Sequence, residues 1–256
     1  MDKPVHDAKT RFSTRVADYV RYRPGYPAAV TEHLRDTIGL NAEWTIADVG
    51  AGTGISSKLF LDAGCEVIAV EPNAEMRAAA TEWLQNSPRF HPIDGSAELT
   101  GLEKHSVHLI VCAQAFHWFD IAPARQEFQR ILKPPGWVVL IWNDRDRNGS
   151  SFAEGYDSLL KQYGTDYQRV RHDRVPTERI NEFFGGKMEE AGFPNQQQFD
   201  FEGLRGRLMS SSYAPLEGHV HHQPMMGKLR ELYDQYQVDG RITFEYRTRV
   251  FRGRLS

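Results

Sequence analysis

The chain has 256 residues, of which 40% are hydrophobic and 25% are charged. These fractions are typical of a globular protein with a substantial core. Because the formal net charge is −3, the chain lacks an overall basic field that would attract nucleic acid or an anionic membrane. The first residues show no signal-peptide pattern, and no run approaches the ~18 apolar residues of a membrane helix.

Both cysteines of the chain, Cys65 and Cys112, lie in apolar runs. This placement does not indicate a secreted framework held by disulfides, whereas it is typical of buried thiols in a reducing compartment. We therefore expect a soluble cytoplasmic protein with neither a nucleic-acid nor a membrane partner.

Between residues 45 and 143, short β-branched runs alternate with longer helical patterns. Gly64 is placed to close the first helix and Asn73 to cap the second, since these residue types are common at helix ends. Continuous apolar strands separated by helices indicate an α/β protein with a parallel sheet covered on both faces. In chain order, we expect strands at 45–50, 65–72, 89–94, 106–116 and 137–143, helices at 55–64, 74–87 and 120–132, and a turn at 133–136.

The composition changes after the last of these strands, but no linker, repeat or boundary signal indicates a second independent core. We expect a single domain over residues 1–256. Its predicted parts are an N-terminal helical arm at 1–44, a ligand-binding core at 45–143 and a helical insertion at 144–195 that roofs the site. A C-terminal part at 196–256 follows, with strands at 196–201 and 242–255 and a substrate-side helix.

Three glycines, Gly50, Gly52 and Gly54, follow the first strand directly. In open α/β sheets, ligands bind beyond the carboxyl ends of the strands, near this position. A dinucleotide fingerprint does not fit, because Ile55 and Ser57 stand where the last glycine of G-x-G-x-x-G belongs. The spacing suits an adenosine with an amino-acid tail and no phosphate, or it marks only a tight turn between strand and helix.

Glu71 lies at the end of the second strand, about 20 residues after the glycines. At that place a carboxylate can accept hydrogen bonds from both hydroxyls of a ribose. The plain alternative is a solvated acid at the start of a helix. Together with the glycines, Glu71 favours a nucleoside ligand.

The segments "DVGAGTG" (48–54) and "VIAVEPNAEM" (67–76) resemble motif I and its partner acid in class I S-adenosylmethionine (SAM)-dependent methyltransferases. With "DGSAE" (94–98), "AQAFHWFD" (113–120) and later segments, including "SYAP" (212–215), the chain resembles the type-11, UbiE-like methyltransferases. It is most similar to their branch with trans-aconitate-type carboxyl methyltransferases. The chain departs from the family at His108, where aspartate is usual, and at Pro135, where glycine is usual.

The resemblance implies a Rossmann-like, mostly parallel sheet of seven strands, with the last hairpin strand antiparallel and helices on both faces. It implies SAM as cofactor, S-adenosylhomocysteine as product and no metal. "HVHH" (219–222) lacks a ligand set of recognisable spacing, and we interpret it as a polar surface. The implied cofactor-binding residues are Tyr19, Arg23, Asp48, Gly50, Gly52, Thr53, Gly54, Glu71, Pro72, Met76, Asp94, Ser96, Ala97 and Gln114.

Three further residues are candidates for catalysis. Trp118 is predicted to pack against the sulfonium, and His117 to orient or deprotonate the acceptor. Arg145 is predicted to pair with a substrate anion. The plain alternatives are packing for the His–Trp pair and solvation for the arginine.

The leading hypothesis is in-line methyl transfer from SAM to a small-molecule acceptor, with O-methylation of a carboxylic acid. A carboxylate is ionised at neutral pH and needs only cationic anchors, for which Arg21, Arg23 and Arg145 are candidates. A quinone-type or phenolic acceptor would instead need a base such as His117. From other classes, a nicotinamide-dependent oxidoreductase and a non-catalytic SAM-binding protein stay as alternatives.

Overall fold

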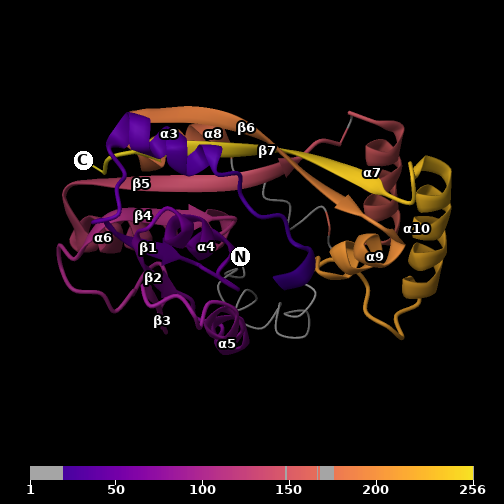
Figure 1. The fold of residues 1–256 in the computed structure, drawn as a ribbon, viewed down its shortest axis with the longest axis horizontal. Coiled ribbons are helices and arrows are strands. Elements are labelled where there is room, and N and C mark those ends of the chain that lie inside the picture. Colours follow the sequence, from indigo (N-terminus) through magenta and orange to yellow (C-terminus); the bar gives the residue numbers. More distant parts are fainter. Residues whose placement is uncertain (1–19, 148, 166, 168–175, 256) are drawn as a thin grey trace.

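A computed structural model of the protein describes residues 20–147, 149–165, 167 and 176–255. Within these residues, the chain forms a seven-stranded sheet in the order β3-β2-β1-β4-β5-β7-β6. Strand β7 pairs antiparallel with β5 and β6, and the other pairs are parallel. The predicted fold class is therefore confirmed (Figure 1). The strands are β1 Thr45–Val49, β2 Glu66–Val70, β3 Phe90–Ile93, β4 Val107–Ala113, β5 Leu132–Arg145, β6 Met188–Phe199 and β7 Ile242–Gly253.

Helices cover both faces of the parallel part of the sheet. Strand β4 shows how, because Leu109 and Val111 belong to one hydrophobic cluster whereas Ile110 and Cys112 belong to another. The cluster around Leu109 includes side chains of α3 Ala29–Ile38 and α4 Ile55–Asp62, and the one around Ile110 includes side chains of α6 Ile121–Ile131 and α8 Thr177–Phe183. Helix α5, Ala74–Trp83, begins at the predicted cap, where the Asn73 side chain accepts a hydrogen bond from the Met76 N–H. Burial of alternate side chains on opposite faces explains why these strands are apolar throughout.

The remaining helices form a separate hydrophobic cluster beyond one end of the parallel strands. We call it the second cluster, to distinguish it from the core on the two faces of the parallel strands. Helices α7 Ser151–Tyr163, α9 Phe201–Met209 and α10 His222–Tyr236 pack there against the ends of β6 and β7 (Figure 1). The pairing of β5 with β7 ends at Arg145 and Tyr246, so Ile242 and Phe244 extend past β5. The expectation of a single domain stays a prediction, because this cluster includes strands of the same sheet. Local patterns gave no boundary because the cluster combines residues 152–167 with residues 199–246.

Several expected boundaries also differ. Strand β6 begins at Met188, so the segment 144–195 is not helical throughout. Strand β5 begins at Leu132, but its register with β4 shifts from Val107–Leu132 to Leu109–Trp137, so residues 133–136, where we expect a turn, are skipped in that pairing. Strand β4 ends at Ala113, and Phe116–Trp118 form a single turn of 3-10 helix. In each case an exposed strand end or a short turn lacks the regular apolar spacing from which element ends are read.

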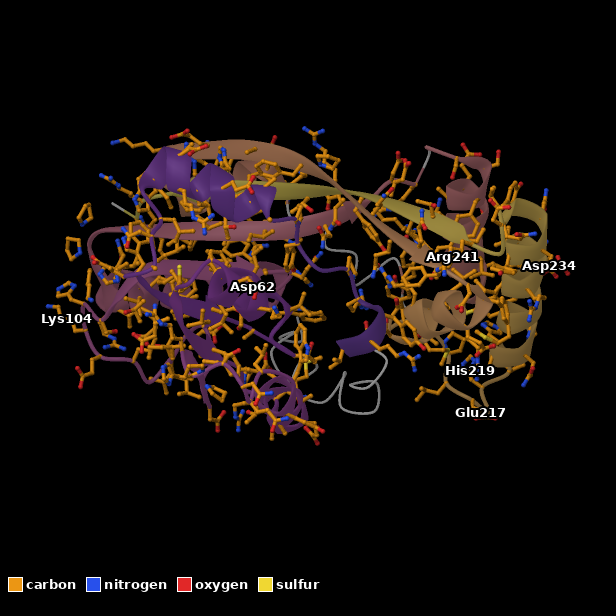
Figure 2. The ribbon with its side chains drawn as sticks, in the orientation of Figure 1. Asp62, Lys104, Glu217, His219, Asp234 and Arg241 are labelled. Carbon is orange, nitrogen blue, oxygen red and sulfur yellow. The ribbon has the colours of Figure 1, made fainter. Side chains whose placement is uncertain are left out.

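Charged side chains such as Asp62, Lys104 and Asp234 lie on the outer surface (Figure 2). Among the described residues, none of the helices has the length and apolar character required to span a membrane.

Candidate cofactor and acceptor site

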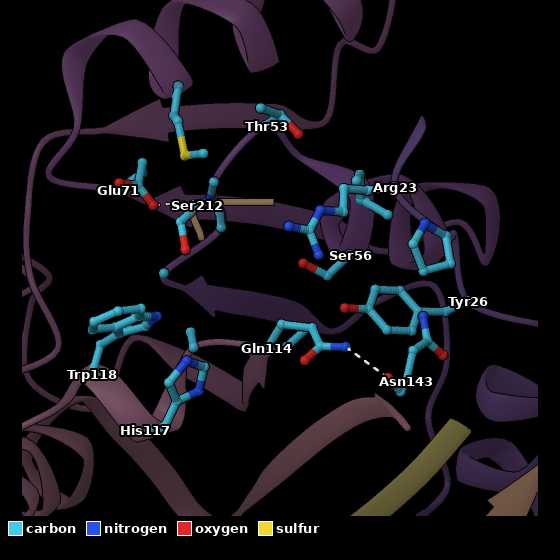
Figure 3. Close-up of a pocket in the computed structure, with 18 of the residues that line it drawn as sticks. Arg23, Tyr26, Thr53, Ser56, Glu71, Gln114, His117, Trp118, Asn143 and Ser212 are labelled. Atoms are coloured by element: carbon cyan, nitrogen blue, oxygen red, sulfur yellow. Dashed lines mark hydrogen bonds between the residues drawn. The ribbon is translucent and has the colours of Figure 1, made fainter. Parts of the chain in front are cut away.

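One cavity lies at the carboxyl ends of β1, β2 and β4 and reaches the second hydrophobic cluster. Glu71 and Trp118 lie on one side of it, and Arg23 and Tyr26 lie on the opposite side (Figure 3). Of the residues predicted from the sequence, those that line the cavity are Arg23, Gly50, Gly52, Thr53, Glu71, Pro72, Met76, Ser96, Ala97, Gln114, His117, Trp118 and Arg145. Asp48, Gly54 and Asp94 do not line it, and Tyr19 lies outside the described residues.

The three glycines have positive φ angles of 73°, 56° and 84°, so each adopts a left-handed conformation that favours glycine. A Cβ at Gly50 would lie 2.6 Å from the Ala115 Cβ, and one at Gly54 would lie 2.9 Å from a methyl group of Leu84. Gly54 therefore serves the packing of α4 against α5 rather than the cavity. At Gly52 the nearest atom would be the Met76 sulfur at 3.7 Å, so this backbone faces open space in the cavity.

Asp48 lies beneath the glycine loop and is fully buried. Its Oδ2 accepts hydrogen bonds from the Ser56 and Ser57 hydroxyls at 2.7 and 2.6 Å, which fixes the first turn of α4. Its Oδ1 has no hydrogen-bond partner among the described residues. Burial raises the pKa of Asp48 to about 6, although the serine hydrogen bonds lower it.

Glu71 is buried and connects two backbone segments. Its Oε2 accepts from the Gly52 N–H and its Oε1 accepts from the Asn73 N–H, each at 2.8 Å. Burial raises the pKa of Glu71, while these two hydrogen bonds lower it. Each carboxylate oxygen has a further lone pair, so Glu71 keeps acceptor capacity toward the cavity.

The loop after β3 contributes differently from the prediction. Ser96 and Ala97 line the cavity, but the Asp94 side chain is 74% exposed and lies 3.3 Å from Arg77 in an ion pair. The expected cofactor contact of Asp94 is therefore not supported, because β3 ends at Ile93 and the loop turns this side chain outward.

The turn after β4 brings Gln114, His117 and Trp118 to the cavity. Gln114 has a φ of 56°, and its Nε2 donates to the Asn143 carbonyl at 3.4 Å. The rings of His117 and Trp118 are half-buried and lie 4.9 Å apart between centroids. All three side chains therefore border the same cavity as the glycine loop.

The plain alternative for Arg145 was a solvated side chain. The side chain is instead only 11% exposed. Its Nη2 donates to Asp157 at 3.2 Å, and its guanidinium lies over the ring of Tyr156. Arg23 donates to the Ser210 carbonyl at 2.9 Å. Arg145 therefore links β5 to the second cluster, and Arg23 links the segment before α3 to the end of α9.

Sequence reasoning missed the cavity residues that the second cluster supplies. These are Arg207 of α9, Ser212 and Tyr213 after it, and Tyr246 of β7. Some fall in segments that carry the family resemblance, but no spacing in the sequence relates them to the glycine loop. Only the extension of β7 past β5 brings them to the cavity.

The histidines at 219–222 lie away from this cavity. His219 accepts a hydrogen bond from the His221 N–H, and buried His222 lies within hydrogen-bond distance of the Pro215 carbonyl. No group of His, Cys, Asp and Glu able to hold a metal ion occurs in the described part of the chain.

Comparisons with known proteins identify the family. A methyltransferase-domain family matches residues 47–140. An uncharacterized methyltransferase of Schizosaccharomyces pombe is 34% identical over 209 residues, which cover 78% of this chain and 77% of that protein. The chain belongs to the SAM-dependent methyltransferases.

A second methyltransferase-like protein of the same yeast is 37% identical over 214 residues, 81% of this methyltransferase and 79% of the relative. A solved structure of a proposed type II methyltransferase from Anaeromyxobacter dehalogenans superposes with a TM-score of 0.65 over 91% of this chain and 98% of that chain. Because this structure is only 21% identical in sequence, its similarity shows the fold alone. The matches support a class I methyltransferase with a type-11 domain, as the sequence resemblance implies.

The buried carboxyl of Asp48 predicts a pH-dependent stability of the methyltransferase. Its folded pKa of about 6 lies above its ordinary value of 3.8, so its contribution is largest below about pH 4 and is lost as the pH rises through about 6. For Asp48→Asn, we expect the stability relative to wild type to improve by about 2 kcal/mol between about pH 4 and about pH 7. Urea denaturation at both pH values measures this, and a difference independent of pH would contradict it.

The glycine loop predicts unequal costs for two alanine substitutions. In Gly52→Ala the alanine must adopt a left-handed conformation, but its Cβ meets no clash. We therefore expect the free energy of unfolding to fall by about 1–2 kcal/mol. Gly50→Ala also meets the Ala115 Cβ and should lose about 1–3 kcal/mol more. Urea denaturation of the two variants tests the ranking, and equal losses would show that the Ala115 contact relaxes freely.

Proposed function

We propose that the protein transfers the methyl group of SAM to a carboxylate oxygen of a small organic acid. The observation that carries the proposal is a single cavity with the glycine loop and Glu71 at one end and arginines, including buried Arg207, at the other. When bound, SAM supplies a methyl group on a positively charged sulfur, and S-adenosylhomocysteine is the product.

The residues at the glycine-loop end fit SAM. The Gly52 backbone faces open space, and the buried Thr53 hydroxyl has no hydrogen-bond partner among the described residues. In this proposal, Glu71 accepts hydrogen bonds from the ribose hydroxyls, Ser96 and Ala97 border the adenine, and Arg23 lies near the amino-acid carboxylate. Asp48 acts indirectly, because it holds the serines at the start of α4.

The middle of the cavity would position the acceptor. His117 and Trp118 line the same cavity, so in this proposal their rings restrict how the acceptor approaches the methyl group. Alignment of reacting groups contributes roughly 7–11 kcal/mol when the geometry is good. Because a carboxylate is already ionised at neutral pH, no base is required. His117 therefore has a positioning role in this proposal.

The far end favours an anionic acceptor, because Arg145, Arg147 and Arg207 line it. This charge supports placing the protein near the carboxyl methyltransferases, the trans-aconitate-type branch that the sequence resembles. As part of the same proposal, the buried free thiols of Cys65 and Cys112 fit a reducing cytoplasm.

A paired substitution tests the cofactor end. Glu71→Gln removes a charged acceptor of ribose hydrogen bonds, which is worth roughly 1.5–3 kcal/mol. We expect SAM affinity to fall by about 10–100-fold in calorimetric titration. Asp94→Asn is the matched control, since this nearby carboxylate is exposed and outside the cavity, and it should leave the affinity unchanged. Equal effects would exclude the proposed role of Glu71.

The acceptor class is tested by product analysis. Incubation with methyl-labelled SAM and a metabolite extract, followed by mass spectrometry, should give labelled methyl esters that release methanol in mild alkali. Label that resists alkali, as in a methylated phenol or ring carbon, would overturn the carboxylate assignment while leaving methyl transfer established.

A further inference from the structure

Arg207 is a buried cation at the far end of the cavity. Arg207 lies on α9 and lines the cavity, and it is only 7% exposed. Its Nε donates to the Tyr246 hydroxyl at 3.2 Å, and its Nη1 donates to the Ser211 hydroxyl at 3.3 Å. Both partners are neutral groups. Within the described ranges, no carboxylate forms an ion pair with Arg207.

Three other cations near this end share one carboxylate partner. Asp157 lies 3.2 Å from Arg145, 3.8 Å from Arg147 and 2.7 Å from Lys161. One carboxylate thus serves three cations, and none of its oxygens reaches Arg207 in these contacts. The end of the cavity at Arg207 therefore carries an excess of positive charge.

The positive charge at this end of the cavity affects the pKa of Tyr213. Burial alone raises the pKa of its phenol, but the charges of Arg207, Arg145 and Arg23 outweigh burial, and the pKa is lowered. The direction of this shift is the one expected for an acid beside positive charges.

The guanidinium of Arg207 has donors left for a ligand. It carries five N–H groups, and the two hydrogen bonds to Tyr246 and Ser211 use only one on Nε and one on Nη1. No hydrogen bond from Nη2 occurs among the described residues. The remaining N–H groups on the two terminal nitrogens form the planar fork that matches a carboxylate.

Burial of a guanidinium without a counter-ion opposes folding, whereas an apolar side chain of similar size would not. We propose that Arg207 binds the ionised carboxylate of the acceptor and thereby determines the preference for acids. This inference rests on the proposed function. Arg145 then supports the site through Tyr156 and Asp157, and Tyr246 and Ser211 hold the Arg207 fork in place.

The experiment compares a carboxylate with its neutral analogue. Benzoate and benzamide have the same shape but differ in charge, and the tyrosine rings of the cavity suit a planar body. Full-length protein saturated with S-adenosylhomocysteine is titrated with each in thermal-shift and calorimetric measurements. We expect benzoate to raise the melting temperature of the wild type and benzamide to have little effect.

Arg207→Met removes the charge but keeps most of the volume. We expect benzoate affinity to fall at least ~10-fold, without loss of melting temperature in the absence of benzoate, because the buried charge is gone. Arg205→Met is the matched control, since Arg205 lies on the same helix, is exposed and pairs with Glu202. It should bind benzoate as the wild type does. Arg207→Gln serves as a second variant if Met impairs folding.

Two outcomes overturn the proposal. One is benzoate binding that survives both Arg207 substitutions, and the other is a wild type that does not distinguish benzoate from benzamide. If Arg207 had only a structural role, its substitution would lower the melting temperature and leave benzoate binding intact. SAM affinity should be unchanged in Arg207→Met, so failure at the cofactor end appears separately, as absent SAM binding in the wild type.

Discussion

The carboxylate of Glu71 joins two backbone segments that the sequence separates, since it accepts one hydrogen bond from Gly52 and another from Asn73. These bonds hold the glycine loop after β1 against the start of α5. Because Glu71 is buried, loss of either bond would leave a desolvated oxygen. Asp48 fixes the same loop from below through Ser56 and Ser57. The shape of the cofactor end of the cavity depends on these two acids.

The acceptor end depends on a different part of the fold. Strands β6 and β7 run past the end of β5. The helices α7, α9 and α10 cover the part of these strands that lies beyond β5. The cavity lies where this second cluster meets the parallel strands. Arg207 and Tyr213 therefore belong to a part of the fold separate from the glycine loop.

Charge is distributed unevenly along the cavity. Buried Glu71 and Asp48 lie at or beneath the glycine-loop end. Buried Arg207 lines the other end with part-buried Arg145 and Arg147, which share Asp157. Methyl transfer from a sulfonium to an anion brings a cation and an anion together, and this distribution supports binding each at its own end. The low dielectric of a buried site strengthens both interactions.

Local patterns in the sequence determined the parallel strands, the cap at Asn73 and the glycine turn, because periodic burial and positive φ angles constrain residue types directly. Edge strand β6 was placed too late, since its exposed residues such as Glu189 and Gln196 show no apolar alternation. Only the tertiary structure decided that Ser96 rather than Asp94 lines the cavity, and that Arg207 lies there at all. The direction of a loop side chain and the meeting of distant helices depend on packing, which no spacing along the chain records.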